Sequence, residues 1–159
     1  MTRIAITGHR GLPERTTAAV ETQLHAELEN RAGRELVGIS CIADGPDASF
    51  ARAVLDVGGS LVVVVPAQKY RESLPTEHHA LYDDLYSSAA QVITLDHVES
   101  DSEAHQAGSV RMLDEADELI AVWDGKPARG YGGTADVVAV ARERGMPITV
   151  VWPEGASRD

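Results

Sequence analysis

Hydrophobic and polar positions follow a repeating order along this chain, in which a short apolar run precedes a longer amphipathic stretch. Residues 3–7 (RIAIT) form a short β-rich run. Val20, Leu24 and Leu28 then recur at the spacing of one helix face. The pattern predicts a strand followed by a helix.

The same order continues to the end of the chain. Residues 61–65 (LVVVV) are apolar without alternation, as expected for a strand that is covered on both faces of a parallel sheet. Further strands are predicted at residues 36–42, 91–95, 118–123 and 147–152, and further helices at residues 48–57, 81–89, 102–115 and 134–144.

This alternation of strands and helices predicts the fold class: α/β, with a single doubly wound, Rossmann-like parallel sheet of about six strands and helices on both faces. We expect the strand order 3-2-1-4-5-6, which reverses between the first and fourth strands. Loops that leave the carboxyl ends of the strands then gather on one rim, where such sheets bind ligands. We expect one domain at residues 1–153 and a flexible tail at residues 154–159.

Composition narrows the class of protein. The chain has 159 residues, enough for one buried core, and Cys41 is its only cysteine, so no intramolecular disulfide is possible. The longest apolar run is far shorter than the roughly 20 residues that a membrane-spanning helix needs. No charged and then apolar leader is evident. We expect a cytoplasmic protein without membrane contact.

The net charge is −11 and the isoelectric point is near 4.9. Nucleic-acid binding depends on releasing counterions to a basic surface, so no nucleic-acid partner is expected. A small phosphorylated molecule is compatible with this charge, because backbone N–H groups at helix starts and one or two arginines are enough to hold it.

Polar and glycine-rich clusters follow four of the predicted strands, on the expected ligand rim. The candidate binding residues there are Gly8, His9 and Arg10; Asp44, Gly45 and Asp47; Pro66 and Tyr70; and Asp124. An arginine fork matches a phosphate, and a rim carboxylate can accept hydrogen bonds from ribose hydroxyls. The alternative is that these are a solvated arginine, a packed histidine, capping carboxylates and an Asp-Gly turn.

Gly132, Gly133 and Thr134 precede the last predicted helix. Glycines there let backbone N–H groups approach an anion, and Thr134 is suited both to cap the helix and to donate to a phosphate. Asp136 lies in the first turn, where a carboxylate can meet a ribose hydroxyl. The alternative is a flexible loop with an ordinary cap.

Other sites of chemistry have no support in the sequence. His78 and His79 lack companions at metal-ligand spacing, and Cys41 falls within a predicted strand, so no metal site is expected. The glycine-rich dinucleotide fingerprint, the P-loop and the serine-hydrolase motif are all missing. No cofactor is expected.

Taken together, these motifs resemble the SLOG superfamily, the Rossmann-like group that includes the Lonely Guy phosphoribohydrolases, the DNA-processing A-like proteins and the YpsA-like proteins. The resemblance spans nearly the whole chain and comes from ITGHRGL at 6–12, ADGPDASFARAVLDVGGSLVVVVP at 43–66 with Tyr70 beyond it, and GGTADVVAVARERGMPITVVWP at 132–153. It implies recognition of a nucleotide or nucleotide-derived molecule, a phosphate or ribose grip at residues 132–134, and a homodimer.

One departure from the family bears on catalysis. Lonely Guy enzymes split an N-glycosidic bond with the motif Pro-Gly-Gly-x-Gly-Thr-x-x-Glu, whereas this chain has Val137 at the glutamate position and Asp136 one residue early. One residue on a helix is a rotation of about 100°. The leading hypothesis is therefore binding or sensing of a nucleotide-derived ligand.

Two other functions stay open. One is hydrolysis or transfer at the glycosidic bond of a nucleoside monophosphate, with Asp136, Asp124 or Asp44 as the acid and Arg10 or Arg111 holding the 5′-phosphate. For that function Asp136 and Arg111 are the candidate catalytic residues. The other is an interaction scaffold that keeps the fold and lacks the site.

Overall fold

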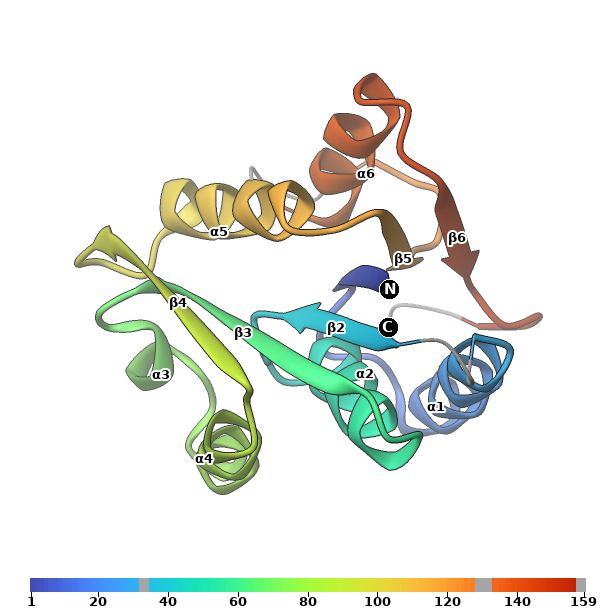
Figure 1. Ribbon diagram of the computed structural model, residues 1–159, viewed down its shortest axis with the longest axis horizontal. Helices are drawn as coiled ribbons and strands as arrows, with labels where there is room; N and C mark the ends of the chain where they lie inside the picture. The colour runs from blue at the N-terminus through green and yellow to red at the C-terminus, as the bar shows by residue number, and fades with distance from the viewer. Residues whose placement is uncertain (32–34, 128–132, 157–159) are drawn as a thin grey trace.

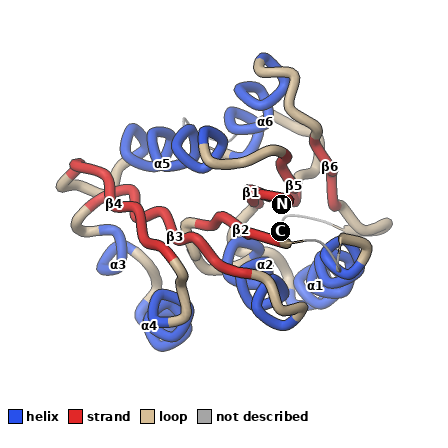
Figure 2. Tube along the Cα trace, in the orientation of Figure 1, coloured by secondary structure: helices blue, strands red, loops and turns tan. Residues whose placement is uncertain are grey.

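The computed structural model describes residues 1–31, 35–127 and 133–156. Within these residues a single sheet of six strands runs through the molecule (Figure 2). Every pair of neighbouring strands in it is parallel. The predicted α/β class is confirmed. The strands are β1 (Thr2–Gly8), β2 (Leu36–Ser40), β3 (Ser60–Ala67), β4 (Gln91–His97), β5 (Glu118–Val122) and β6 (Ile148–Val151).

Helices connect the strands as the sequence pattern predicts. A short helix at Tyr70–Ser73 was expected to be loop, because four residues are too few to show helical periodicity. No helix in the described part of the chain is long and apolar enough to cross a membrane. The helices are α1 (Glu14–Glu29), α2 (Pro46–Asp56), α3 (Tyr70–Ser73), α4 (His79–Ser87), α5 (Ser102–Asp114) and α6 (Thr134–Glu143), with a 3-10 turn at Thr76–His78.

The strand order is β4-β3-β2-β1-β5-β6, so the expected order 3-2-1-4-5-6 is wrong. The fourth strand continues outward beside β3, and the fifth returns to pair with β1. The order therefore reverses between β1 and β5. The physical reason lies in burial: β4 is largely exposed, as suits an edge strand, whereas residues 119–122 of β5 are all buried.

This topology assigns the helices to two layers. Right-handed crossovers that move in one direction along the sheet place α1, α2 and α4 on one face, and the return from β4 to β5 places α5 and α6 on the other. Figure 1 shows α5 and α6 above the sheet and α1, α2 and α4 below it. The carboxyl ends of the strands meet on one rim, between the two layers.

Apolar side chains fill both interfaces between sheet and helices. On the α1–α2 face, Ile4, Ile6, Leu24 and Phe50 are fully buried. Burial of each such side chain stabilises the fold by roughly 1.5–3 kcal/mol. The core on both faces fixes the strands whose ends carry the candidate site.

Candidate ligand site at the carboxyl ends of the strands

The reversal of strand order opens the ligand rim between β1 and β5. Gly8 and Val122 are register partners at the carboxyl ends of these strands. Beyond them the chain leaves β1 toward α1 on one face and leaves β5 toward α6 on the other. In open parallel sheets this divergence forms the crevice where ligands bind.

His9 and Asp124 connect the two diverging loops. The backbone N–H of Asp124 donates to Nε2 of His9 at 3.2 Å, and Oδ1 of Asp124 lies 3.2 Å from the same nitrogen. Both side chains are buried, and the imidazole also packs edge-on against Trp152. Oδ1 of Asp124 accepts the N–H of Lys126 at 2.9 Å as well. These contacts give both residues a structural role.

Arg10 is the cation of the rim. Its Nε and Nη2 atoms donate to the same oxygen, Oδ1 of Asp44, at 3.0 and 2.6 Å. The Arg10 side chain is still 46% exposed. A guanidinium has five N–H donors in a planar fork. The donors that Asp44 does not use are therefore held in a fixed orientation and face solvent.

Asp47 lies in the first turn of α2, beside this ion pair. Burial raises the pKa of the Asp47 carboxyl to about 7, and the charge of Asp44 acts in the same direction. A hydrogen bond from the backbone of Ala43 and the charge of Arg10 oppose the rise in this pKa. Asp47 therefore changes its charge near neutral pH, close to the Arg10 guanidinium.

His105 completes this cluster from the opposite helix layer. Its ring lies edge-on to Tyr70, with centroids 5.8 Å apart, and its Nε2 is 2.8 Å from Oγ of Ser100. Burial, followed by the charge of Arg10, lowers the pKa of His105, while Asp101 opposes this. No sequence motif identified His105, because only the packing of α5 over the sheet brings it to the rim.

The loop after β2 is held in a strained conformation. Ile42 has a φ of 48°, which is rare for a β-branched residue. Its N–H donates to Oγ of Ser40, and its carbonyl lies 2.9 Å from Nε2 of the buried His78. Gly45, with a φ of 95°, then directs the chain into α2. Strain held by surrounding contacts is typical of functional loops.

Two predicted binding residues have a packing explanation. A Cβ atom at Gly8 would lie 2.7 Å from Cβ of Pro46, so only glycine lets α2 approach β1 this closely. Pro66 packs against α5, where a Cβ on Gly108 would lie 2.9 Å from its Cγ. Gly8 and Pro66 therefore shape the rim by packing.

The first turn of α6 lies at the same rim. Gly133 occupies the N-cap position, so Thr134 is the first helical residue and not the cap that the sequence suggested. Thr134 is buried, and the N–H of Asp136 donates to the carbonyl of Gly133 at 3.0 Å. Gly132 lies outside the described residues.

Arg111 does not reach this rim. It is in the last turn of α5, where its Nε donates to Glu115 at 3.3 Å. Glu115 also lies 3.6 Å from the guanidinium of Arg3, near the amino end of β1. This geometry places Arg111 near the amino end of β1, so α5 does not bring it together with the candidate residues at the carboxyl ends of the strands.

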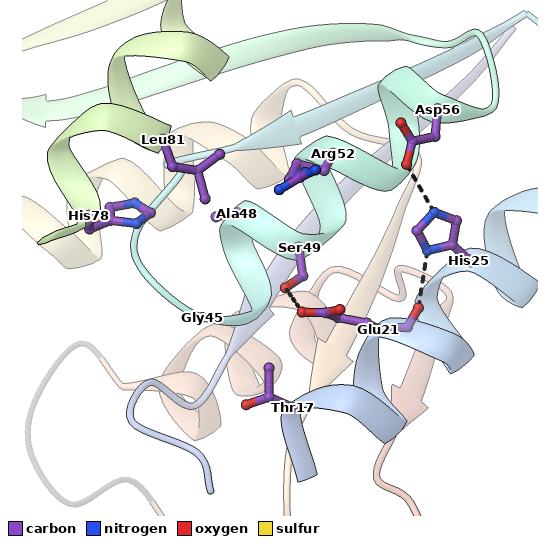
Figure 3. A pocket seen from close by; sticks show the side chains of 10 residues that line it. All are labelled: Thr17, Glu21, His25, Gly45, Ala48, Ser49, Arg52, Asp56, His78 and Leu81. Carbon is purple, nitrogen blue, oxygen red and sulfur yellow. Dashed lines mark hydrogen bonds and ion pairs between the residues drawn. The ribbon is translucent and has the colours of Figure 1, made fainter. Parts of the chain in front are cut away.

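A separate hollow of about 390 Å³ lies on the α1–α2 face and extends toward α4 (Figure 3). His25 and Asp56 close one side of it, with Nε2 and Oδ2 3.2 Å apart. Among the described residues, no group of three or more histidine, cysteine, aspartate or glutamate side chains is placed to hold a metal ion. The lining residues are Thr17, Glu21, His25, Gly45, Ala48, Ser49, Arg52, Asp56, His78 and Leu81.

Comparison with known proteins shows similarity at the level of structure. No protein-family model and no curated protein sequence matches the chain. DNA processing protein A from Streptococcus pneumoniae matches with a TM-score of 0.71 and 20% identity, over 98% of this chain and 52% of that one. The chain thus spans about half the length of that protein.

Two further structures match the same fold. DNA processing protein A from Helicobacter pylori has a TM-score of 0.68 and 17% identity, over 98% of this chain and 68% of that one. The Moco carrier protein from Chlamydomonas reinhardtii has a TM-score of 0.56 and 14% identity, over 94% of this chain and 74% of that one. The chain shares its Rossmann-like fold with these proteins, among them the DNA-processing A-like group that its motifs resemble.

These comparisons correct one expectation about partners. The Helicobacter pylori structure describes a single-stranded DNA binding mode, so a protein of this fold does bind nucleic acid. Net charge averages over the whole surface, whereas recognition depends on the local field at a site. The net charge of −11 therefore does not exclude a nucleic-acid partner, and that expectation is wrong.

Proposed function

We propose that this protein binds a nucleotide-derived phosphorylated molecule at the carboxyl ends of β1, β2 and β5. The observation that carries the proposal is the Arg10 guanidinium, which is oriented by Asp44 and is still 46% exposed beside the reversal of strand order. An arginine held in this way is pre-organised for a phosphate, because little side-chain freedom is lost on binding.

The rest of the rim supplies the complementary groups. Backbone N–H groups in the first turn of α6 favour negative charge, and Gly133 leaves room for close approach. Asp136, in the same turn, is the proposed acceptor for a ribose hydroxyl. Phosphate and ribose recognition therefore come from the two sides of the crevice.

The comparisons support a binding role at the level of the fold. One similar structure is a Moco carrier protein, and another binds single-stranded DNA. Proteins with this fold thus hold ligands of different kinds. The site residues of this chain, and not the fold, narrow the proposal to a phosphorylated, nucleotide-derived ligand.

The arrangement of carboxylates favours binding over glycosidic-bond cleavage. Asp44 is occupied by Arg10, and Asp124 accepts the N–H of Lys126 and contacts His9. Val137 stands where the hydrolase motif has its glutamate. Asp44 and Asp124 would have to leave these contacts to act as a catalytic acid.

Isothermal titration against AMP, ADP, GMP and a single-stranded oligonucleotide tests the proposal. We expect at least one mononucleotide to bind, and Arg10→Ala to weaken that binding by about tenfold or more, since charge-assisted hydrogen bonds contribute roughly 1.5–3 kcal/mol. Arg144→Ala is the matched control, because Arg144 also pairs with one carboxylate, Asp114, at 2.7 Å.

Three results would overturn the proposal. They are no nucleotide binding at millimolar concentration, equal affinities for wild type and Arg10→Ala, or binding of the oligonucleotide alone. Chromatography of the same mixtures for free base separates binding from hydrolysis.

A further inference from the structure

The hollow on the α1–α2 face is a second concave site, and the function proposed above uses none of its polar side chains. Its volume of about 390 Å³ lies within the range usual for small-molecule sites. Residues four positions apart share one face of a helix, so each helix presents a row of side chains to the hollow. Glu21 and His25 come from α1, Arg52 and Asp56 from α2, and His78 from the turn before α4.

The charged side chains of the hollow do not all neutralise one another. Nε2 of His25 lies 3.2 Å from Oδ2 of Asp56, so these two form a pair. Glu21 accepts only the hydroxyl of Ser49, at 3.4 Å, and a hydroxyl removes no charge. Arg52 forms no hydrogen bond or ion pair with any residue that the structure describes. The hollow therefore presents one uncompensated carboxylate and one uncompensated guanidinium.

His78 adds a hydrogen-bond acceptor to the wall. It is only 7% exposed, and its Nε2 lies 2.9 Å from the carbonyl oxygen of Ile42. A carbonyl oxygen only accepts, so Nε2 carries the proton and Nδ1 of the neutral ring is an acceptor. Within residues 1–31, 35–127 and 133–156, Nδ1 makes no hydrogen bond. Buried acceptors are usually satisfied, so this nitrogen points to a ligand that carries N–H or O–H donors.

The arrangement of these groups narrows the chemistry of the ligand. Figure 3 shows Arg52 between His78 on one side and the His25–Asp56 pair on the other. A guanidinium fork matches a carboxylate, and an ammonium group offers three N–H donors to the acceptors beside it. A molecule with an anionic group alone leaves Glu21 unmatched, and one with a cationic group alone meets the charge of Arg52.

We propose that the hollow binds a zwitterion of the α-amino acid class, with its carboxylate on Arg52 and its ammonium group on Glu21. In such a molecule both charged groups are attached to one carbon, as a guanidinium flanked by acceptors requires. Ala48 and Leu81 are the apolar residues of the lining, so an apolar side chain fits best. This site is independent of Arg10 and of the phosphorylated ligand proposed for the rim.

NMR titration of the backbone amides with three related probes tests the assignment. L-leucine carries both charged groups, 4-methylpentanoate lacks the amino group, and 3-methylbutylamine lacks the carboxylate. We expect saturable shift changes at Glu21, Ser49 and Arg52 with L-leucine. Each analogue should bind at least about tenfold more weakly, because it loses a charge-assisted hydrogen bond.

Two variants locate the charged groups. Arg52→Gln and Glu21→Gln change exposed side chains, so the fold should persist, and each should weaken L-leucine binding by about tenfold or more. Arg15→Gln is the matched control, because Arg15 is an exposed arginine of α1 that does not line the hollow. Arg10→Ala should also keep the wild-type affinity for L-leucine.

A solvated seam between helices, without a ligand, would give no saturable L-leucine binding at tens of millimolar, and that result overturns the inference. Equal affinities for L-leucine and 4-methylpentanoate, or unchanged L-leucine binding in Arg52→Gln, overturn it as well. Loss of L-leucine binding in Arg10→Ala would show that the hollow is not an independent site. The nucleotide titrations decide the proposed function separately, so either proposal can fail alone.

Discussion

His9 and Asp124 lie in contact across the point where strand order reverses, with Nε2 of the imidazole 3.2 Å from Oδ1 of the carboxylate. Both side chains are buried. The loop that carries Arg10 and the loop that leads to α6 are thereby fixed to each other. The relative position of these loops determines the width of the proposed ligand crevice.

Replacing His9 with alanine should therefore damage both stability and binding. The imidazole is buried against Trp152, so its removal leaves a cavity and buried polar groups without this partner. We expect His9→Ala to lower the free energy of unfolding by about 2–3 kcal/mol in urea titrations, and to weaken nucleotide binding. His97→Ala, at the exposed end of β4, is the control. An unchanged urea midpoint for His9→Ala would contradict the role of His9 in fixing the two loops.

Gly8→Ala tests the close approach of α2 to the end of β1. Its Cβ would lie 2.7 Å from Pro46 and 3.0 Å from Cβ of Val122, and both neighbours are packed in the core. We expect a loss of about 2 kcal/mol or more, because overpacking forces backbone shifts. At Gly11, φ is 68° and no atom lies within 4 Å of the added Cβ, so Gly11→Ala should cost only about 1 kcal/mol. Equal effects would show that packing at Gly8 is loose.

Asp47 should make wild-type stability depend on pH in a defined direction. Its folded pKa is about 7 and its ordinary value is 3.8, so the folded state holds this proton where the unfolded state has lost it. The resulting stability is present at acidic pH and is lost as pH rises toward 7.

Asp47→Asn should remove this dependence. Between pH 5 and pH 8, the advantage of the variant over wild type in free energy of unfolding should grow by about 2 kcal/mol. In contrast, Arg71 lowers the pKa of Asp83, so Asp83→Asn should lose a little stability at pH 8. Denaturant titrations at the two pH values measure both differences. If the difference in free energy of unfolding between Asp47→Asn and wild type were the same at pH 5 and pH 8, the raised pKa of Asp47 would be contradicted.

The sequence was sufficient to predict the six strands and the longer helices, because burial imposes periodic patterns on them, whereas the four-residue helix α3 was missed. Residues 61–65 show this most clearly: they form a buried strand, as their unbroken apolar run indicates. Strand order was harder. The exposed and polar residues of QVITLDH are typical of an edge strand and the apolar ELIAV of a central one, but the expected order did not take this into account and placed the fourth strand beside the first.

The candidate site was predictable only where residues follow a strand directly. Arg10 and Asp44 meet because both leave neighbouring strands at the same rim. Helix residues are different: His105 reaches the rim and Arg111 does not, because they lie at opposite ends of α5. That distinction depends on which end of the helix faces the rim, which no motif in the sequence shows.

NMR mapping of backbone amides during titration with the best nucleotide from the panel tests the central claim most directly. We expect the largest chemical-shift changes at Arg10, Asp47, His105 and the first turn of α6, and we expect Arg10→Ala to remove them. Changes confined to the hollow on the α1–α2 face, at Thr17, Ser49 and Arg52, would contradict it.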